Sequence, residues 1–301
     1  MKILNFGSCN IDYVYSLDHI VAVGETETSD KLEIFPGGKG LNQSIAAARA
    51  GAKVYHAGCV GEDGGLLTDV LSNSGVDLTY LKKIDGKSGH AIIQLSHKGA
   101  NSIFLYPGAN EAMTKEYIDE VLSHFEKGDI LCLQNEINLV DYLVDKAYDK
   151  GMRIILNPSP FNEKLDKVDY GKLSFVILNE VEGQAIAGGG NDPAGILANI
   201  KAKYPRLEIV LTLGAKGCVY TDGEREIYHA AFDAPVIDTT AAGDTFTGYF
   251  MAELARGKDY PEILKIASAA SALAISKKGA APSIPLLADV QKAANTLPLC
   301  E

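Results

Sequence analysis

The sequence lacks the features of several protein classes. None of its five cysteines belongs to a C-x-x-C pair or a metal-type cluster, and such an odd, dispersed set is typical of reduced intracellular thiols. Positive charge is also scarce, because 28 Lys and Arg residues face 39 Asp and Glu residues and the formal net charge is −11. Since non-specific nucleic-acid binding needs a cationic surface, we expect no nucleic-acid partner.

Long apolar runs are missing as well. The most apolar stretch, residues 266–275, is about half as long as a membrane helix and is interrupted by serines. The N-terminus shows no charged leader ahead of a long apolar core, so no signal peptide is visible. With 47% hydrophobic and 22% charged residues over 301 positions, the composition is that of a globular protein. We expect a cytoplasmic enzyme with no membrane partner.

Short apolar runs rich in Ile, Val and Leu alternate with longer amphipathic stretches. The strand-like runs are residues 3–6, 54–60, 130–133, 153–156, 175–178 and 209–213. The helix-like stretches are residues 41–50, 66–73, 115–125, 139–150, 194–204 and 245–256. Continuous apolar strands separated by helices indicate parallel strands that are covered on both faces. The sequence therefore predicts an α/β fold, a three-layer α/β/α sandwich with a mostly parallel central sheet.

Two segments, residues 12–36 and 77–108, break this rhythm because polar and apolar residues alternate in them and no helix is evident. Residues 91–106 read as a hairpin with a turn at Lys98–Asn101. We infer that the two segments form a small β-sheet lid on a main domain of residues 1–11, 37–76 and 109–301. Such a sheet would close over a site or pair with a second subunit. An ordinary surface hairpin is the alternative.

The strongest chemical motif runs from Asp238 to Gly248. The apolar segment Pro235–Ile237 reads as a strand end that leads into small residues at 241–243 and then into a helix. Small residues let a ligand approach the backbone, and N–H groups at a helix start bind anions. A carboxylate in this turn, Asp244, could accept a proton from a reacting group. Alternatively, Asp244 only satisfies the N–H groups of the helix start.

A second glycine-rich turn, Gly37–Gln43, also opens a helix. Its polar residues Lys39, Asn42 and Gln43 offer hydrogen bonds to a polyhydroxylated ligand. A single glycine-rich turn is weak evidence, because many loops contain one. The turn is not a Walker P-loop, which has the pattern G-x-x-x-x-G-K followed by Ser or Thr, and Gly86–Ser88 does not fit that pattern either.

Three smaller polar sets follow predicted strands. They are Asn10–Asp12, Asn179–Glu182 and Thr212–Gly217. Open α/β sheets bind ligands at the carboxyl edge of their strands, where these sets are expected to lie. Each set alone has a structural explanation, such as a helix cap or a glycine turn. Together with the two glycine-rich motifs they favour one shared cleft.

These motifs, in this order, resemble those of the ribokinase (pfkB-type) carbohydrate kinase family. The pair Asn157-Pro158 and the tail Lys278–Pro285 extend the similarity from about residue 2 to residue 290. The resemblance implies a ribokinase-like fold and an ATP-dependent sugar kinase that phosphorylates the 5-hydroxyl of ribose. Another pentose, a hexose (as in fructokinases) or a nucleoside remains an open alternative for the substrate.

The resemblance also implies roles for individual residues. Asp244 would be the catalytic base, and the backbone of Ala241, Ala242 and Gly243 would hold the charge on the transferring phosphoryl group. The residues implied to bind the sugar are Asn10, Asp12, Gly38, Lys39, Asn42 and Glu136, together with Asp244. The residues implied to contact the nucleotide are Asn179, Thr212, Leu213, Gly214, Ala215, Lys216, Gly217, Gly243 and Ser268.

Two cations are implied in the same way. Glu182 would orient Mg²⁺ through water. The residues implied to hold a K⁺ activator are Asp238, Thr240, Ala274, Lys277, Gly279 and Ser283, whose oxygen atoms suit a hard cation.

Some residues differ from the commonest family pattern. Ala241 occupies a position where many relatives have Gly, which we expect to be tolerated if its φ is that of a right-handed helix. Ser268 stands where ribokinases often have His or Asn. The bulky lid residues His90 and Tyr106-Pro107 would narrow the sugar pocket. An open lid sheet also exposes strand edges, so we expect a homodimer that pairs two lids.

Two other classes of function are weaker. A non-catalytic sugar- or nucleotide-sensing module could use the same fold, but the presence of Asp244 and of the cation loops argues against it. A dinucleotide-dependent oxidoreductase needs G-x-G-x-x-G after the first strand, where Gly7-Ser-Cys-Asn10 stands instead.

Overall fold

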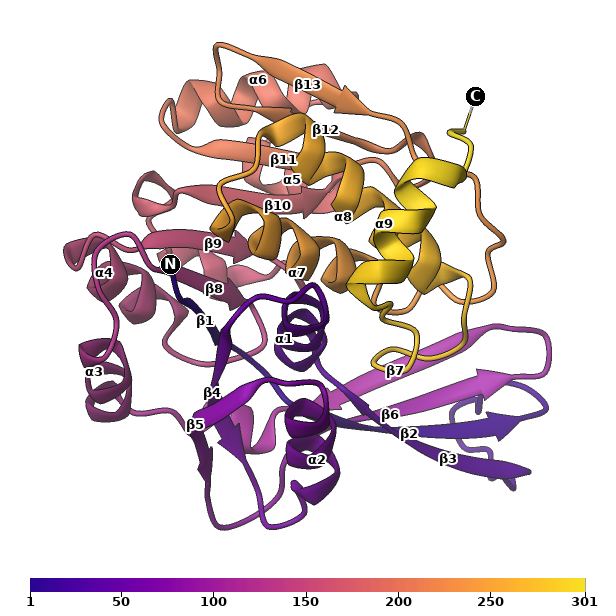
Figure 1. Cartoon of the computed structure of the whole chain (residues 1–301). Coiled ribbons are helices and arrows are strands. Elements are labelled where there is room, and N and C mark those ends of the chain that lie inside the picture. Colours follow the sequence, from indigo (N-terminus) through magenta and orange to yellow (C-terminus); the bar gives the residue numbers. More distant parts are fainter. Residues whose placement is uncertain (301) are drawn as a thin grey trace.

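The computed structural model describes residues 1–300, which form two sheets and the helices around them (Figure 1). The larger sheet has nine strands in the order β13-β12-β11-β10-β9-β8-β1-β4-β5. Its strands are β1 (Ile3–Phe6), β4 (Val54–Val60), β5 (Asp77–Lys83), β8 (Ile130–Gln134), β9 (Arg153–Asn157), β10 (Phe175–Asn179), β11 (Glu208–Thr212), β12 (Cys218–Thr221) and β13 (Glu226–His229). All neighbours from β5 to β11 pair in parallel, and β12 and β13 add an antiparallel edge.

Helices cover both faces of this sheet. One face carries α1 (Lys39–Arg49), α2 (Gly65–Asn73), α7 (Ala242–Ala255), α8 (Tyr260–Ile275) and α9 (Leu287–Thr296). The other carries α3 (Lys115–Ser123), α4 (Val140–Asp149), α5 (Glu180–Ala187) and α6 (Pro193–Lys203). Because both faces are covered, β1 and β8 are buried at every residue. The predicted three-layer sandwich is confirmed.

Within the described residues, no helix is both long and apolar enough to span a membrane. All five cysteines are free, and four of them are buried.

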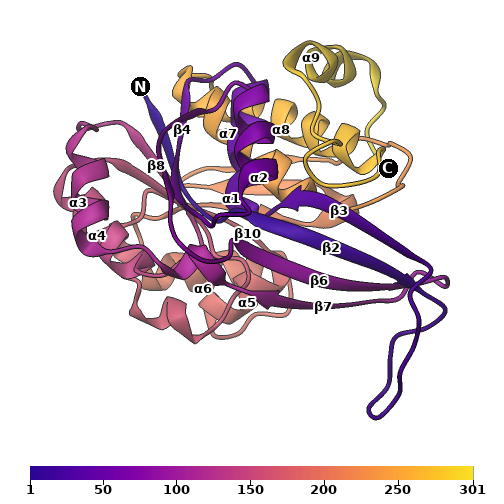
Figure 2. The ribbon, with the colours of Figure 1, turned by 90° about the horizontal axis from the view of Figure 1, so that it is seen from below.

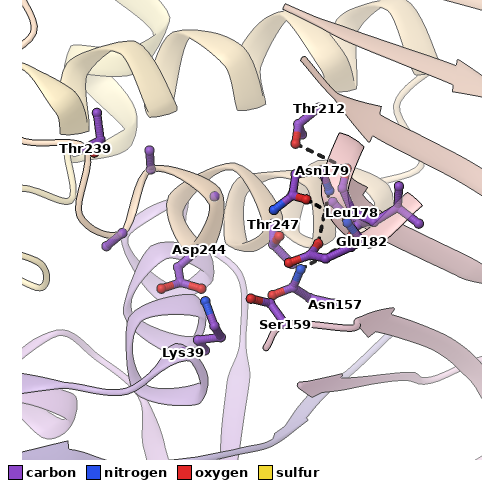
Figure 3. A pocket seen from close by; sticks show the side chains of 14 residues that line it. Lys39, Asn157, Ser159, Leu178, Asn179, Glu182, Thr212, Thr239, Asp244 and Thr247 are labelled. Carbon is purple, nitrogen blue, oxygen red and sulfur yellow. Dashed lines mark hydrogen bonds between the residues drawn. The ribbon is translucent and has the colours of Figure 1, made fainter. Parts of the chain in front are cut away.

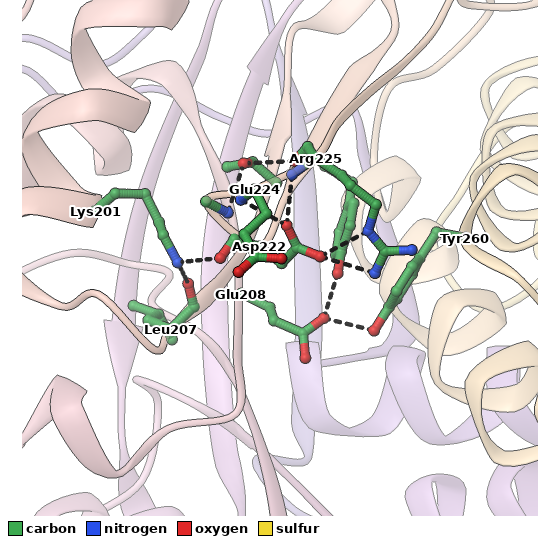
Figure 4. Close-up of polar contacts among 10 residues, drawn as sticks. Lys201, Leu207, Glu208, Asp222, Glu224, Arg225 and Tyr260 are labelled. Atoms are coloured by element: carbon green, nitrogen blue, oxygen red, sulfur yellow. Dashed lines mark hydrogen bonds and ion pairs between the residues drawn. The ribbon is translucent and has the colours of Figure 1, made fainter.

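Side-chain contacts fasten the antiparallel edge of the sheet to α8 (Figure 4). The Oε2 atom of Glu208 accepts hydrogen bonds of 2.5 Å from the hydroxyl groups of Tyr220 and Tyr260, whose rings stack with their centroids 3.9 Å apart. Arg225 pairs with Asp222 at 2.8 Å and lies over the Tyr260 ring. Glu208 is the first residue of β11. These contacts therefore lie at the amino end of that strand, whereas the site described below lies at its carboxyl end.

The smaller sheet projects from the main domain as a four-stranded lid (Figure 2). Its order is β3-β2-β6-β7, formed by β2 (Asn10–Leu17), β3 (Lys31–Gly37), β6 (Gly89–Ser96) and β7 (Asn101–Tyr106). β6 and β7 form the predicted hairpin, whereas β2 and β6 pair in parallel.

The predicted boundary of the lid is wrong at one point. Residues 77–83 form β5, which pairs in parallel with β4 at the edge of the main sheet, so the second lid segment begins near Gly89. β5 is only half-buried, and its alternating pattern therefore resembles that of a lid strand.

Candidate active site

A cavity of about 230 Å³ opens where the carboxyl ends of β9, β10 and β11 meet the first turns of α1, α5 and α7 (Figure 3). Its lining includes eight of the predicted site residues: Lys39, Asn179, Glu182, Thr212, Ala241, Ala242, Gly243 and Asp244. It also includes six residues to which the sequence analysis assigned no role: Asn157, Ser159, Ile177, Leu178, Thr239 and Thr247. Thr247 follows Asp244 by three helical residues and so lies on the same helix face, a spacing that could have revealed it.

Asp244 lies in the first turn of α7 with only 7% of its surface exposed. Its carboxylate accepts two hydrogen bonds of 3.0 Å from α1, one from Nδ2 of Asn42 and one from Nε2 of Gln43. The side chain of Lys39 points toward it from the start of α1 (Figure 3). Burial lowers the pKa of Lys39, but the carboxylates of Asp244, Glu136 and Glu182 outweigh burial and raise it overall. The glycine-rich turn and the Asp244 turn therefore form one charged site.

The turn before α7 differs from the prediction in two ways. Residues 235–237 form no strand, and Val236 and Ile237 are 68% and 64% exposed. Ala241 has φ +60° and ψ +12°, which is left-handed rather than right-handed helical geometry. For an L-residue this conformation costs roughly 1–2 kcal/mol. The strained peptide precedes the N–H groups of the first turn, which have no acceptor within the helix, and Ala241 to Gly243 line the cavity.

The predicted sugar-binding residues gather where β2 leaves the main domain. Oδ1 of Asn10 accepts a hydrogen bond of 2.7 Å from Asn110. Glu136 accepts one of 3.0 Å from the N–H of Lys39 and one from the Ser8 hydroxyl. Burial and the negative charge of Glu136 raise the pKa of Asp12 to about 7. Asn10 thus lies in the same region as the half-buried carboxylates of Asp12 and Glu136.

Gly38 is the residue before α1 and has φ +95°. A Cβ atom there would lie 2.9 Å from the backbone N of Asn10. Only glycine therefore allows α1 to start so close to β2.

The lid register corrects the prediction for the bulky lid residues. Asp12 lies opposite Ala91, whereas His90 lies opposite Ile11 and Tyr106. Because side chains alternate between the faces of a sheet, His90 and Tyr106 are on the face opposite to Asp12. The ring of His90 packs against that of Tyr106, with centroids 4.9 Å apart. These two side chains therefore do not narrow the space beside Asp12.

On the other side of the cavity, Asn179 and Glu182 cap α5 reciprocally. Asn179 Oδ1 accepts from the N–H of Glu182, and Glu182 Oε2 accepts from the N–H of Asn179, both at 3.0 Å. Thr212 donates to the carbonyl of Leu178 at 3.2 Å. These residues line the cavity, whereas the turn 213–217 and Ser268 are not part of its lining. Ser268 is buried, with Oγ 3.6 Å from Cys218 Sγ.

The two loops predicted to hold K⁺ lie in direct contact. Asp238 Oδ2 accepts a hydrogen bond of 2.9 Å from the N–H of Gly279, and Oδ1 accepts from the N–H and hydroxyl of Thr240. Ser283 is buried close by in sequence and donates to the carbonyl of Ala280 at 2.8 Å. Carboxylate, hydroxyl and carbonyl oxygens are the donors that a hard cation prefers, so this set fits K⁺.

Six buried side-chain oxygen atoms lack partners among the described residues, and two of them lie at the site. These two are Oδ1 of Asn42, beside Asp244, and Oγ1 of Thr247, in a residue that lines the cavity. Buried polar atoms in native proteins are nearly always hydrogen-bonded. The Thr247 oxygen therefore fits a polar ligand in the cavity, and the Asn42 oxygen fits one beside Asp244.

Comparison with known proteins places the chain in a family. It matches the pfkB family of carbohydrate kinases over residues 1–287. Ribokinase from Bacillus subtilis is 34% identical over 292 residues, which cover 95% of this chain and 97% of that protein. Deoxyribokinase from Salmonella typhi is 30% identical over 298 residues, which cover 95% of this chain and 96% of that protein. Arabidopsis thaliana ribokinase, in a structure complexed with ribose and ATP, is 29% identical with a TM-score of 0.86, covering 97% of this chain and 98% of that one.

The chain belongs to the pfkB family of carbohydrate kinases. This result confirms the resemblance drawn from the motifs and the predicted enzyme class, an ATP-dependent carbohydrate kinase.

Proposed function

We propose that this protein is a ribokinase, which transfers the γ-phosphoryl group of ATP to the 5-hydroxyl of D-ribose with Asp244 as the general base. The observation that carries the proposal is the setting of Asp244. Its carboxylate is buried and is held by two amides of α1, in the first turn of the helix whose N-terminal residues line the cavity.

In the proposed reaction Asp244 takes the proton of the sugar hydroxyl as its oxygen forms a bond to the γ-phosphorus. The bond from that phosphorus to the β–γ bridging oxygen breaks, and ADP leaves. The N–H groups at the start of α7 stabilise the charge on the transferring group, where preorganised donors are most effective. Asn10, Asp12, Gly38, Lys39, Asn42 and Glu136 bind the sugar.

Cations assist the proposed nucleotide side of the site. Only one oxygen of Glu182 is used in the helix cap, so the other is available to hold Mg²⁺ through water, and the metal when bound neutralises phosphate charge. Asn179 and Thr212, which line the cavity, contact the nucleotide. The turn 213–217 and Ser268, which lie outside the lining, contact the part of the nucleotide that extends beyond it. Asp238, Thr240, Ala274, Lys277, Gly279 and Ser283 hold K⁺.

The decisive variant is Asp244→Asn, which keeps the shape of the side chain and removes the base. We expect turnover to fall by at least about 10³-fold while the thermal midpoint and ATP binding change little. Turnover within tenfold of the parent would overturn Asp244 as the base. The substrate is tested by ADP release with a panel of sugars and nucleosides, in K⁺ and in Na⁺. We expect a ribose-selective signal that rises with K⁺.

Deoxyribose is the second candidate, because the deoxyribokinase of Salmonella typhi is nearly as similar to this chain as the ribokinase of Bacillus subtilis. The panel separates the two sugars directly, and a preference for 2-deoxyribose would leave the mechanism unchanged.

We also propose a homodimer formed by two lids. All six residues of β7 are exposed at an unpaired edge of the lid, and Ile103 to Tyr106 are each more than half exposed. An exposed apolar edge strand favours pairing with another chain. Light scattering should give twice the chain mass of 32.1 kDa, and the mass of a single chain at micromolar concentration would reject the dimer.

A further inference from the structure

A chain of buried amide side chains leads from Asp244 into the core. Gln43 donates to Asp244, and its own Oε1 accepts a hydrogen bond of 2.7 Å from Nε2 of Gln134. The same Gln134 nitrogen donates to Oδ1 of Asn5 at 2.9 Å. Asn5, Gln43 and Gln134 come from β1, α1 and β8, and all three have no exposed surface.

A backbone carbonyl fixes the direction of this chain. Nδ2 of Asn5 lies 2.7 Å from the carbonyl oxygen of Gly40, which can only accept, so this end of Asn5 is the NH₂ group. The oxygen of Asn5 must then face Gln134, which uses its NH₂ group for both Asn5 and Gln43. That donation occupies the oxygen of Gln43 and leaves the NH₂ group of Gln43 to face Asp244, with a further contact to Asn157 at 3.2 Å.

Gln134 makes all of its side-chain hydrogen bonds through its nitrogen. Its Oε1 is buried without a partner among the described residues, and its third contact, with Cys132, is also made by the nitrogen. Leaving a buried carbonyl unpaired is unfavourable, and an apolar residue of the same size would avoid it. The same apolar residue would leave the oxygens of Asn5 and Gln43 without a donor, so the amide of Gln134 is explained by the two side chains that it holds in place.

We propose that Gln134 is a positioning residue for Asp244. It acts through Gln43 by keeping the donor end of that amide on the carboxylate, which holds the carboxylate in its orientation. This inference rests on the proposed function, because it assumes that Asp244 is the base. Lys39, Glu136 and Glu182 are the charged groups near Asp244, and the thiol of Cys132 is the titratable group in contact with Gln43 and Gln134. None of these four residues changes in the variants below.

The test compares Gln134→Met, Gln43→Met and the double variant. Methionine keeps the length of the side chain and removes the donor. We expect kcat of Q134M to fall by about tenfold, with the KM values for ATP and sugar within twofold of the parent. The thermal midpoint of Q134M should also fall, because the buried oxygens of Asn5 and Gln43 lose their donor. If Gln134 acts through Gln43, the double variant is no slower than Q43M alone. Gln184→Met, an exposed change of the same type on α5, should behave as the parent.

A second variant, Gln134→Glu, gives a distinct signature and covers the case in which Q134M does not fold. An ionised glutamate can only accept, so Gln43 turns and places its oxygen against Asp244, whereas a protonated glutamate can still donate. We expect kcat of Q134E to gain a falling limb at high pH that neither the parent nor Q184M shows. A lower thermal midpoint without that limb would mark a purely structural residue and overturn the proposal.

Asp244→Asn, measured alongside, distinguishes a failure of the proposed function from a failure of the positioning role of Gln134. If D244N keeps its turnover, the proposed function fails. If D244N is inactive while Q134M matches the parent, or while the effects of Q43M and Q134M simply multiply, the positioning role fails and the proposed function stands.

Discussion

Replacing Gly248 with alanine should separate the two helices that form the candidate active site. Gly248 lies in α7 against α1, and a Cβ atom there would be 2.3 Å from Cβ of Ala46, 2.7 Å from the carbonyl oxygen of Gln43 and 2.8 Å from the backbone N of Ala47. Two of these atoms belong to the backbone of α1 and cannot turn aside. The helices must therefore move apart by on the order of 1 Å to restore ordinary contact distances.

The expected loss of stability follows from two opposing effects. Overpacking a close-packed interior typically costs about 1–3 kcal/mol, and alanine regains at most about 1 kcal/mol through its higher helix propensity. We therefore expect the free energy of unfolding of G248A to be lower by about 1–2 kcal/mol. Denaturation by urea measures it. Gly65→Ala in α2 is the matched control, since a Cβ atom at Gly65 meets nothing within 4 Å.

The same movement should affect catalysis. Asn42 and Gln43 in α1 donate to Asp244 in α7 at 3.0 Å, and an extra 1 Å would take both contacts beyond hydrogen-bond distance. We expect kcat of G248A to fall at least about tenfold. If G248A is as stable and active as G65A, the close approach of the two helices does not position Asp244 and our reasoning is wrong.

Two further predictions concern the backbone and the pH dependence. Ala241→Gly should raise the free energy of unfolding by about 0.5–1 kcal/mol, because the strain removed from the left-handed backbone exceeds the cost of the extra freedom of glycine in the unfolded chain. Urea denaturation measures this difference, and a less stable A241G would contradict the observed φ of +60°. The pKa of Asp12 is raised to about 7, so the folded state binds the proton more tightly than the unfolded state, and stability falls as pH rises from about 4 to 7. The variant Asp12→Asn should not show this loss. From pH 4 to pH 8, its free energy of unfolding should therefore rise by about 1–3 kcal/mol relative to that of the parent. A difference between variant and parent that does not change with pH would refute the raised pKa.

The main sheet, its helices and the loops around the cavity could be predicted from the sequence because they depend on local patterns. Buried parallel strands such as β8 and β10 are continuous apolar runs. The residues that line the cavity at 179–182 and 241–244 follow from helix-start chemistry and from the family motifs.

The errors arose where a side chain's surroundings depend on distant partners. β5 has the same alternating pattern as a lid strand, and only pairing decides which sheet it joins. The face on which His90 lies depends on its register with Ile11, because a shift of one residue would reverse it. The segment 235–237 is apolar but exposed, so hydrophobicity alone predicted a strand that does not exist.

The parallel pairing of β2 with β6 makes the lid depend on long-range contacts. The lid joins two chain segments that lie far apart in the sequence, with β4 and β5 of the main sheet encoded between them. Closing such a long loop is unfavourable until other contacts have brought its ends together. Because β7 is exposed along its whole length and β3 has only one buried residue, we expect the lid to open more readily than the buried main sheet. Because β2 carries Asn10 and Asp12, we expect mild denaturation to disrupt the proposed sugar-binding side of the site before the cavity between α5 and α7.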